Sequence, residues 1–337
     1  VVTGREFDPS EMGRAEARLA VVKVPDERVE RVAEVCGSPK TTQPEVTFVD
    51  LMALHRGEEH TSRDDSLTKV AGDADAFALV VQCFGDLDHR GEPLEPGADL
   101  EALMLEMTIT DLGVVEGRLK RIEAETKAEK DIMNIERGLL ERVQAQLEEG
   151  GLVRDMDLSD DEARMLRGFN LLTSKPLLVV FNVSDEDLRA QTCTGACKLA
   201  EESGLTWIPV SAGLEQELAE LDEETRAEFL AEYGLEALAR DRFIRAAYEL
   251  LDVITFFTAN DNEARAWTIS AGASAREAAG KVHSDMYEGF IRAEVIPFDR
   301  LDELGSVAAC KEAGCVRLEG KDYEVQDGDI LDIRFNR

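Results

Sequence analysis

Three polar segments, each following an apolar run, contain the side chains best suited to chemistry in this chain: Asp50, Asn182–Asp185 and Ser211–Ala212. Ligands of open α/β sheets bind just beyond the carboxyl ends of the strands, so such segments can share one site. A carboxylate there can hold Mg²⁺ through water, and an amide followed by a carboxylate can hydrogen-bond a base edge. The pattern therefore predicts a nucleotide site, with a strand that simply ends in an Asx-type turn as the alternative.

The elements that would position these residues alternate between strand and helix patterns. Leu177–Phe181 is an unbroken apolar run, typical of a strand buried on both faces of a parallel sheet. Asp26 can cap a helix over Glu27–Val35. The other expected strands of this part are Leu19–Val24, Glu45–Asp50, Ala76–Cys83 and Thr206–Val210. Such alternation predicts an α/β fold with a doubly wound, mostly parallel sheet.

A long antiparallel helical hairpin is expected between two of these strands, over residues 100–163. Its apolar residues recur at helical spacing and would form the seam of the hairpin. They are Leu100, Leu103, Met107, Ile132, Ile135, Leu139 and Val143. Arg118, Lys120 and Arg121 form one of the few basic clusters of the chain. A solvated helix face is one interpretation of this cluster, and a contact with RNA or a ribosomal partner is the other.

After Asp252 the apolar period changes to two, which predicts a compact β-grasp-like module with the helix Ala275–His283. Lys281, His283 and Arg292 are its candidate contacts to RNA or protein, with ordinary surface charge as the alternative. The strands expected in this module are Ile254–Ala259, Ala264–Ile269, Glu294–Phe298, Lys321–Val325 and Ile330–Phe335.

The composition limits the classes of partner. The 337 residues include 71 acidic and 38 basic side chains, a formal charge of −33. Such a surface repels bare phosphate backbones, so a nucleic-acid partner would need a local basic patch. The sequence lacks an apolar stretch of the length that spans a membrane and a signal-peptide pattern, which favours a soluble, cytoplasmic chain without membrane contact. We also expect a monomer.

The cysteines do not form a disulfide framework in a chain of this length. Cys193 and Cys197 are spaced C-x3-C, and Cys310 and Cys315 are spaced C-x4-C. Neither pair has a clustered histidine, so zinc is not favoured. A redox-sensing regulator that uses Cys193 and Cys197 remains an alternative function.

Several segments resemble one family in the same order along nearly the whole chain. Arg265–Val295 and Glu319–Leu331 closely resemble the TGS domain of the YchF/Obg-like ATPase family. Glu217–Leu235 and Ile254–Ala259 resemble the linker region of that family. Ala20–Arg28 resembles the strand after its first switch segment.

The resemblance implies a P-loop NTPase G-domain with a helical insertion and a C-terminal TGS domain. The G-domain would comprise residues 1–99 and 164–252, the hairpin 100–163 and the TGS domain 253–337. It also implies hydrolysis of ATP or GTP with Mg²⁺, and association with the ribosome (50S or 70S) or its RNA through the TGS domain and the hairpin.

On the phosphate side of the implied site, Asp50 matches the switch II carboxylate that acts on Mg²⁺ through water. Leu54 matches the hydrophobic residue found where GTPases place a catalytic glutamine, and His55 could position water. Two positions depart from the family: Arg14 stands where a threonine contacts Mg²⁺, and Ala53 where a glycine donates its N–H to the γ-phosphate. Arginine cannot ligate a cation, and alanine restricts φ.

On the base side, Asn182, Val183 and Asp185 match the base-specificity loop, and Ser211 and Ala212 match the loop after it. Family members typically carry Asn-x-x-Glu, whereas GTPases carry Asn-Lys-x-Asp. The missing lysine favours ATP, whereas Asp185 favours GTP because a carboxylate can accept two hydrogen bonds from guanine. We expect ATP to be preferred.

The sequence contains no G-x-x-x-x-G-K-[ST], the loop that holds the β- and γ-phosphates. The opening V-V-T-G fits the end of a helix that follows such a loop, so we expect the natural chain to begin earlier. A P-loop upstream would favour a ribosome-associated hydrolase. Its absence would favour a degenerate family member that acts as a scaffold through its TGS domain and hairpin.

Overall fold

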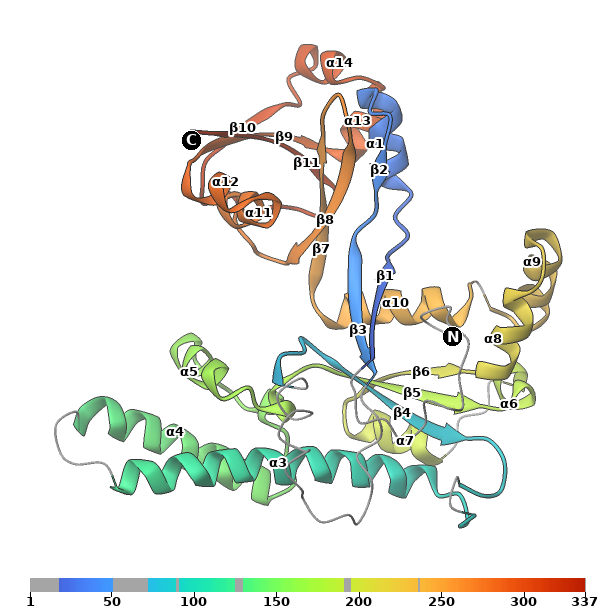
Figure 1. Cartoon of the computed structure of the whole chain (residues 1–337), viewed down its shortest axis with the longest axis vertical. Helices are drawn as coiled ribbons and strands as arrows, with labels where there is room; N and C mark the ends of the chain where they lie inside the picture. Colours follow the sequence, from blue (N-terminus) through green and yellow to red (C-terminus); the bar gives the residue numbers. More distant parts are fainter. Residues whose placement is uncertain are drawn as a thin grey trace. The chain divides into compact units, whose positions relative to one another are not determined.

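The computed structural model describes residues 18–50, 72–88, 91–124, 130–190, 195–235 and 237–336 (Figure 1). Its contacts divide the chain into two compact units. The first contains Val49–Ala246, and the second contains Leu19–Phe48 together with Ala247–Arg337.

The first unit is built on a parallel three-stranded sheet in the order β4 (Phe77–Cys83), β5 (Leu177–Val183) and β6 (Thr206–Val210). All residues of the run Leu177–Phe181 are buried, as its unbroken apolar character predicts. The flanking helices are α6 (Asp185–Ala190), α7 (Gly195–Glu202), α8 (Ala212–Ala219), α9 (Glu223–Glu232) and α10 (Ala239–Leu250).

The predicted helical hairpin is present between β4 and β5. Helix α3 (Pro96–Ala124) packs against α4 (Lys130–Glu148), and Val115, Leu139 and Val143 lie in their common core. Short elements then lead back to the sheet: η2 (Val153–Asp155), α5 (Asp160–Leu166), η3 (Arg167–Phe169) and η4 (Leu172–Ser174).

The apolar stripe of α3 does more than form the hairpin seam. Leu100 and Met107 are buried in the core of the sheet, with Leu103 packed against that core. The first half of α3 therefore covers the sheet, and only its second half pairs with α4. Periodicity identified the buried face of the helix but could not show that two different partners cover it.

Asp111 joins α3 to the turn that precedes β5. Its carboxylate is 1% exposed and accepts hydrogen bonds from the backbone N–H groups of Leu172 and Thr173, both at 2.8 Å. The Thr173 hydroxyl donates a third bond at 2.6 Å. Burial raises the pKa of Asp111 above its usual range, although these three bonds favour the charged form.

The second unit contains a six-stranded sheet in the order β10-β9-β11-β7-β8-β2. Successive residues point to opposite faces: Phe256 lies in one core and Phe257 in the other. The bounds of the strands are β10 (Arg317–Glu319), β9 (Phe290–Pro297), β11 (Asp329–Phe335), β7 (Val253–Ala259), β8 (Ala264–Ser270) and β2 (Thr41–Thr42). The helices are α1 (Arg28–Cys36), α11 (Ala275–Val282), α12 (Ser284–Glu288), α13 (Phe298–Leu304) and α14 (Val307–Glu312).

The early part of the chain packs differently from the expected G-domain. Helix α1 buries Val29 and Val32 in a core of the second unit, and β2 pairs with β8. Among the described strands, β3 (Glu45–Asp50) pairs only with β1 (Arg18–Lys23). The expectation that the strand before Asp50 lies in the same sheet as β5 and β6 is therefore wrong. The domain boundaries drawn from the sequence stay a prediction.

The segment Lys321–Val325 forms a single isolated bridge, between Glu324 and Ser274, where a strand was expected. The segment bonds to the turn before α11 because the Ala275 N–H donates to Tyr323 O at 2.7 Å and the Val325 N–H to Ala273 O at 3.0 Å. The strand β10, which pairs with the outer side of β9 opposite β11, lies just before this segment.

Candidate nucleotide-binding site

Two loops meet beyond the carboxyl ends of β5 and β6. The Ala212 N–H donates a hydrogen bond to Asn182 Oδ1 at 3.1 Å. The Ser211 hydroxyl donates to Asp185 Oδ1. The structure thus brings together four of the residues that the sequence assigned to base recognition, two from each loop.

The sheet register and two helix starts explain this arrangement. Asn182 lies opposite Val210 in the parallel pair of β5 and β6, so the chain leaves both strands at the same level. Ser211 is the N-cap of α8, where its Oγ accepts the Leu214 N–H at 3.3 Å, and its side chain is 4% exposed. Asp185 begins α6. The parallel pair and the N-cap therefore place both loops before any ligand binds.

The side chains of this cluster offer donors and acceptors suited to a base edge. The oxygen of Asn182 is engaged by Ala212, which leaves its amide nitrogen to donate. The second oxygen of Asp185 can accept further hydrogen bonds. Val183 is 4% exposed and packs in the sheet core, so only its backbone is available to a ligand.

Glu215 supports the second loop and was not identified from the sequence. Its side chain is 7% exposed and accepts the Ala239 N–H at the start of α10. Burial raises the pKa of Glu215 above its usual range. Leu214 and Leu218 on the buried face of α8 flank it in the sequence, a pattern that could have marked it as a buried carboxylate.

The phosphate side of the predicted site is only partly described. Asp50 ends β3 with an exposed side chain. No hydrogen bond between described residues joins it to the two loops that contain Asn182 and Ala212. Leu54, His55, Arg14 and Ala53 lie outside the described residues. The part of the chain that the structure describes has no cluster of three metal-ligating side chains. Mg²⁺ bound with a triphosphate needs only one or two carboxylates, so a single Asp50 fits it.

Two of the three basic side chains of the hairpin cluster are paired with carboxylates of the hairpin, and the third bonds to a backbone carbonyl. Arg118 forms an ion pair with Glu136 at 2.7 Å, and Lys120 pairs with Glu116 at 3.2 Å. Arg121 donates to the Gly117 carbonyl at 3.1 Å. These contacts favour the solvated helix face over a free cationic patch.

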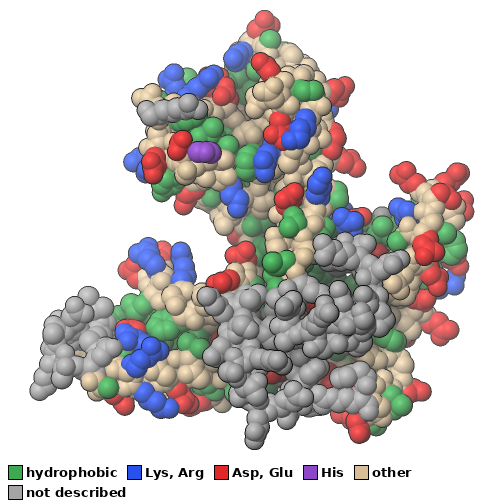
Figure 2. Space-filling view, in the orientation of Figure 1, with side chains coloured by type: hydrophobic (Ala, Val, Ile, Leu, Met, Phe, Trp, Pro, Cys, Tyr) green, Lys and Arg blue, Asp and Glu red, His purple; other side chains and the backbone are tan. Residues whose placement is uncertain are grey.

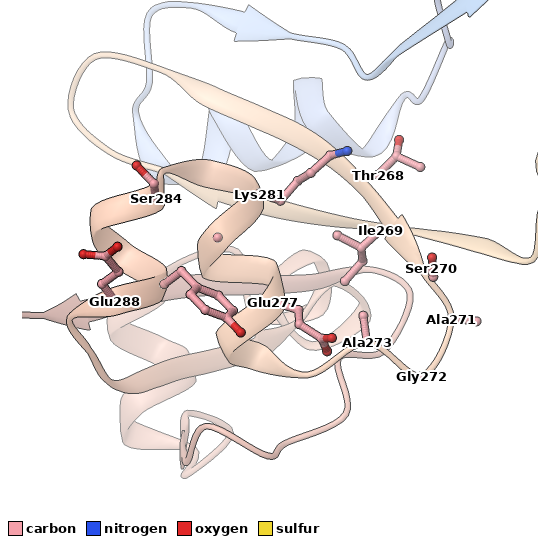
Figure 3. A pocket seen from close by; sticks show the side chains of 12 residues that line it. Thr268, Ile269, Ser270, Ala271, Gly272, Ala273, Glu277, Lys281, Ser284 and Glu288 are labelled. Carbon is pink, nitrogen blue, oxygen red and sulfur yellow. The ribbon is translucent and has the colours of Figure 1, made fainter. Parts of the chain in front are cut away.

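The three candidate contacts of the C-terminal module have different environments. Lys281 lines a cavity of about 770 Å³ between the end of β8 and the helices α11 and α12 (Figure 3). His283 caps α12 and accepts the Asp285 N–H at 3.1 Å. Arg292 is exposed on β9, opposite Arg334. Basic and acidic side chains are intermixed over the visible surface of this module (Figure 2).

The cysteine pair proposed for redox sensing is only half described. Cys197 is buried in the sheet core, whereas Cys193 lies outside the described residues. Cys310 and Cys315 are both free thiols.

The parallel sheet, its covering helices and the loops beyond its carboxyl edge define an α/β nucleotide-binding protein with a P-loop NTPase-like fold. The described helices include none that is long and apolar enough to cross a membrane. The chain has 27% sequence identity to the chain in "Structure of the Schizosaccharomyces pombe YchF GTPase", with a TM-score of 0.83 over 99% of this chain and 91% of that one.

Sequence comparisons identify the family. Residues 253–336 match the family model YchF-GTPase_C, described as a protein of unknown function (DUF933). The chain is 36% identical over 325 residues to the "Ribosome-binding ATPase YchF" of Pasteurella multocida, covering 95% of this chain and 90% of the relative. It is 34% identical to the protein of the same name from Bacillus subtilis, over 94% and 89% of the two chains. The chain belongs to the YchF family.

Proposed function

We propose that, together with a phosphate-binding loop that this sequence does not contain, the chain binds and hydrolyses a nucleoside triphosphate and that hydrolysis is coupled to association with the ribosome in the cytoplasm. The observation that carries nucleotide binding is the hydrogen bond from Ala212 to Asn182, which joins the two loops where a base would lie. The relatives named ribosome-binding ATPases support both hydrolysis and the ribosomal partner.

On the base side, Asn182 would donate its amide hydrogens to the base, and Asp185 would accept from it. The backbone N–H of Ala212 holds Asn182 in place, so the amide is oriented before the nucleotide arrives. On the phosphate side, Mg²⁺ bound with the triphosphate would neutralise charge on the phosphates. Asp50 would hold this ion through water, and Leu54 and His55 would have the roles that the family resemblance implies.

Specificity follows from the side chains of the first loop. Without a lysine after Asn182, no aliphatic stem covers the base, which favours ATP. Asp185 accepts the Ser211 hydroxyl, so one of its oxygens is already engaged. A guanine edge needs two acceptor positions, and for this reason we propose that ATP is preferred over GTP.

The ribosomal contact is assigned to the TGS domain and, secondarily, to the hairpin. Lys281, His283 and Arg292 are exposed, whereas Arg118 is held by Glu136. Replacing the three exposed residues of the TGS domain together should weaken co-sedimentation with 70S ribosomes more than replacing Arg118, Lys120 and Arg121.

Calorimetric titration with ATP and GTP, followed by steady-state hydrolysis assays, tests the proposal on a form of the protein that carries a P-loop. Asn182→Ala should weaken ATP binding about tenfold or more, a loss of about 1.4 kcal/mol. Asn262→Ala is the matched control, because Asn262 is an exposed turn residue of the second unit. Asp50→Asn should lower kcat while leaving most of the affinity.

Failure of both nucleotides to bind the protein would refute the proposal. Binding without hydrolysis would instead support the degenerate scaffold, which is the second candidate function.

A further inference from the structure

The C-terminal end of α14 brings two cysteines together. The Cys315 N–H donates to Cys310 O at 2.9 Å, and the Gly314 N–H donates to Lys311 O at 3.1 Å. Gly314 has φ +69°, the left-handed conformation that this pair of bonds requires. These are the two bonds of a Schellman motif, in which the side chains of the first and sixth residues pack against each other. In this chain those two side chains are thiols.

The backbone bond also limits the distance between the two residues. A 2.9 Å hydrogen bond, with the covalent bonds on either side of it, holds the two Cα atoms within about 7 Å. Disulfides form when the Cα atoms lie roughly 4.4–6.8 Å apart. The separation of the two Cα atoms is therefore compatible with a disulfide.

Arg300 on α13 contacts both sulfur atoms. Its guanidinium Nη2 lies 3.5 Å from Cys315 Sγ, and its carbonyl accepts the Cys310 thiol at 3.6 Å. A guanidinium beside a thiol stabilises the thiolate, which is the nucleophilic form. Glu303 also pairs with Arg300, so it competes with Cys315 for the same guanidinium.

The two thiols differ in access to solvent. Cys315 is partly exposed, whereas Cys310 is 0% exposed. Burial, and then the neighbouring Cys315, raise the pKa of Cys310. An accessible thiol beside a cation, next to a buried and protonated thiol, is an arrangement suited to oxidation in two steps.

We propose that Cys315 is a site of oxidation by hydroperoxides and that Cys310 converts the product into a Cys310–Cys315 disulfide. The Cys315 thiolate attacks the peroxide, takes one oxygen and, after protonation, gives the sulfenic acid and an alcohol or water. The Cys310 sulfur then attacks the sulfenic acid, a new S–S bond forms, and water leaves with the Cys310 proton. This site does not depend on the proposed nucleotide function.

Cys36 on α1 is the competing partner, because it also lies near Cys310. Burial and the neighbouring Cys310 raise the pKa of Cys36, which disfavours its thiolate, the form that reacts with peroxide. The two possible disulfides give different tryptic products. A bond to Cys315 links Leu301–Lys311 to Glu312–Arg317, because trypsin cleaves after Lys311 between the two cysteines. A bond to Cys36 links Leu301–Lys311 to Val32–Lys40.

The test treats the full chain with hydrogen peroxide, alkylates the remaining thiols and maps the tryptic peptides by mass spectrometry. We expect Leu301–Lys311 linked to Glu312–Arg317. Dithiothreitol should separate this pair of peptides, and Cys315→Ser should not form it. Arg300→Gln should slow alkylation of Cys315 several-fold near neutral pH, because the variant lacks the cation beside Cys315 Sγ. Arg334→Gln removes the same charge from another place in the second unit and should leave the alkylation rate unchanged.

Three outcomes would overturn the proposal. They are a linked pair that contains Cys36, Cys315 over-oxidised with Cys310 still alkylated, and full alkylation of both cysteines after peroxide.

Discussion

Replacing Asp111 with alanine should destabilise the first unit strongly, although this residue is remote from the loops that would bind a base. Asp111 is the common acceptor for two backbone N–H groups and one hydroxyl at the start of η4. Alanine leaves these three donors buried without an acceptor. Each unsatisfied buried group costs about 1–3 kcal/mol.

Adding the costs of the three unsatisfied donors overestimates the loss of stability in Asp111→Ala for two reasons. The Thr173 hydroxyl can rotate towards another acceptor, and burial of the carboxylate already has a cost, because burial raises the pKa of Asp111. We therefore expect Asp111→Ala to lower the free energy of unfolding by about 3–4 kcal/mol. Asp111→Asn should lose less, since its oxygen can still accept one or two of the bonds.

Hydrogen exchange followed by mass spectrometry measures this loss locally, which matters because two units need not unfold together. The amides of Leu172 and Thr173 should lose most of their protection in Asp111→Ala. The control is Glu101→Ala, an exposed position on the same helix, which should change stability by less than about 0.5 kcal/mol. ATP affinity should also fall, because η4 sets the start of the strand that ends at Asn182. A loss below about 1 kcal/mol, with Leu172 and Thr173 still protected, would refute the reasoning.

Three further predictions test contacts elsewhere. Asp327→Asn should weaken the ion pair that Arg28 forms with Asp327 at 2.6 Å and lower the stability of the second unit by about 1 kcal/mol. Hydrogen exchange of the α1 amides measures this loss, and unchanged exchange would contradict the prediction. The hydrogen bond from Arg118 lowers the pKa of Glu136 below its usual value. The contribution of this ion pair to folding stability is therefore full above the pKa that Glu136 has in the unfolded chain, and it is lost as pH falls through the pKa of Glu136 in the folded protein. The melting temperatures of wild type and Glu136→Gln should thus differ at pH 7 and converge on acidification, whereas a constant difference would exclude this linkage. Burial raises the pKa of Tyr323 to about 12. In an ultraviolet pH titration, the phenolate absorbance that wild type shows and Tyr323→Phe lacks should therefore appear near that pH. Appearance near pH 10 would show that the Tyr323 phenol is not buried as described.

The elements that the sequence predicted well are those whose patterns depend on local neighbours. The unbroken run Leu177–Phe181 had to be buried on both faces, and it is. The expected helix Ala275–His283 is α11, Ala275–Val282.

The partners of these elements could not be predicted in the same way. Alternation in Glu45–Asp50 indicates a strand but contains no information about which strand it pairs with. Val29 and Val32 show that one face of a helix is buried, yet any apolar sheet could cover that face. The choice depends on contacts between residues far apart in the chain, and a single sequence does not record them.

The same difference between local patterns and long-range contacts applies to the residues of the candidate site. Asn182, Asp185, Ser211 and Ala212 follow directly from strand ends, so their meeting could be expected once the two strands were neighbours. Glu215 could not be placed, because its role depends on the start of α10. The role of Asp50 stays a prediction, since the strand that precedes it belongs to another sheet.

The pairing of β2 with β8 has a consequence for synthesis of the protein. Lys40, just before β2, forms an ion pair with Glu263, which lies 223 positions later in the chain. At about 5–20 residues per second, a ribosome needs roughly 10–45 s to make the intervening segment. During that time the apolar face of α1 has no sheet to cover it, although the helix has already left the exit tunnel. Helix α1 can therefore bury Val29 and Val32 only after strands β7, β8, β9 and β11 have been synthesised.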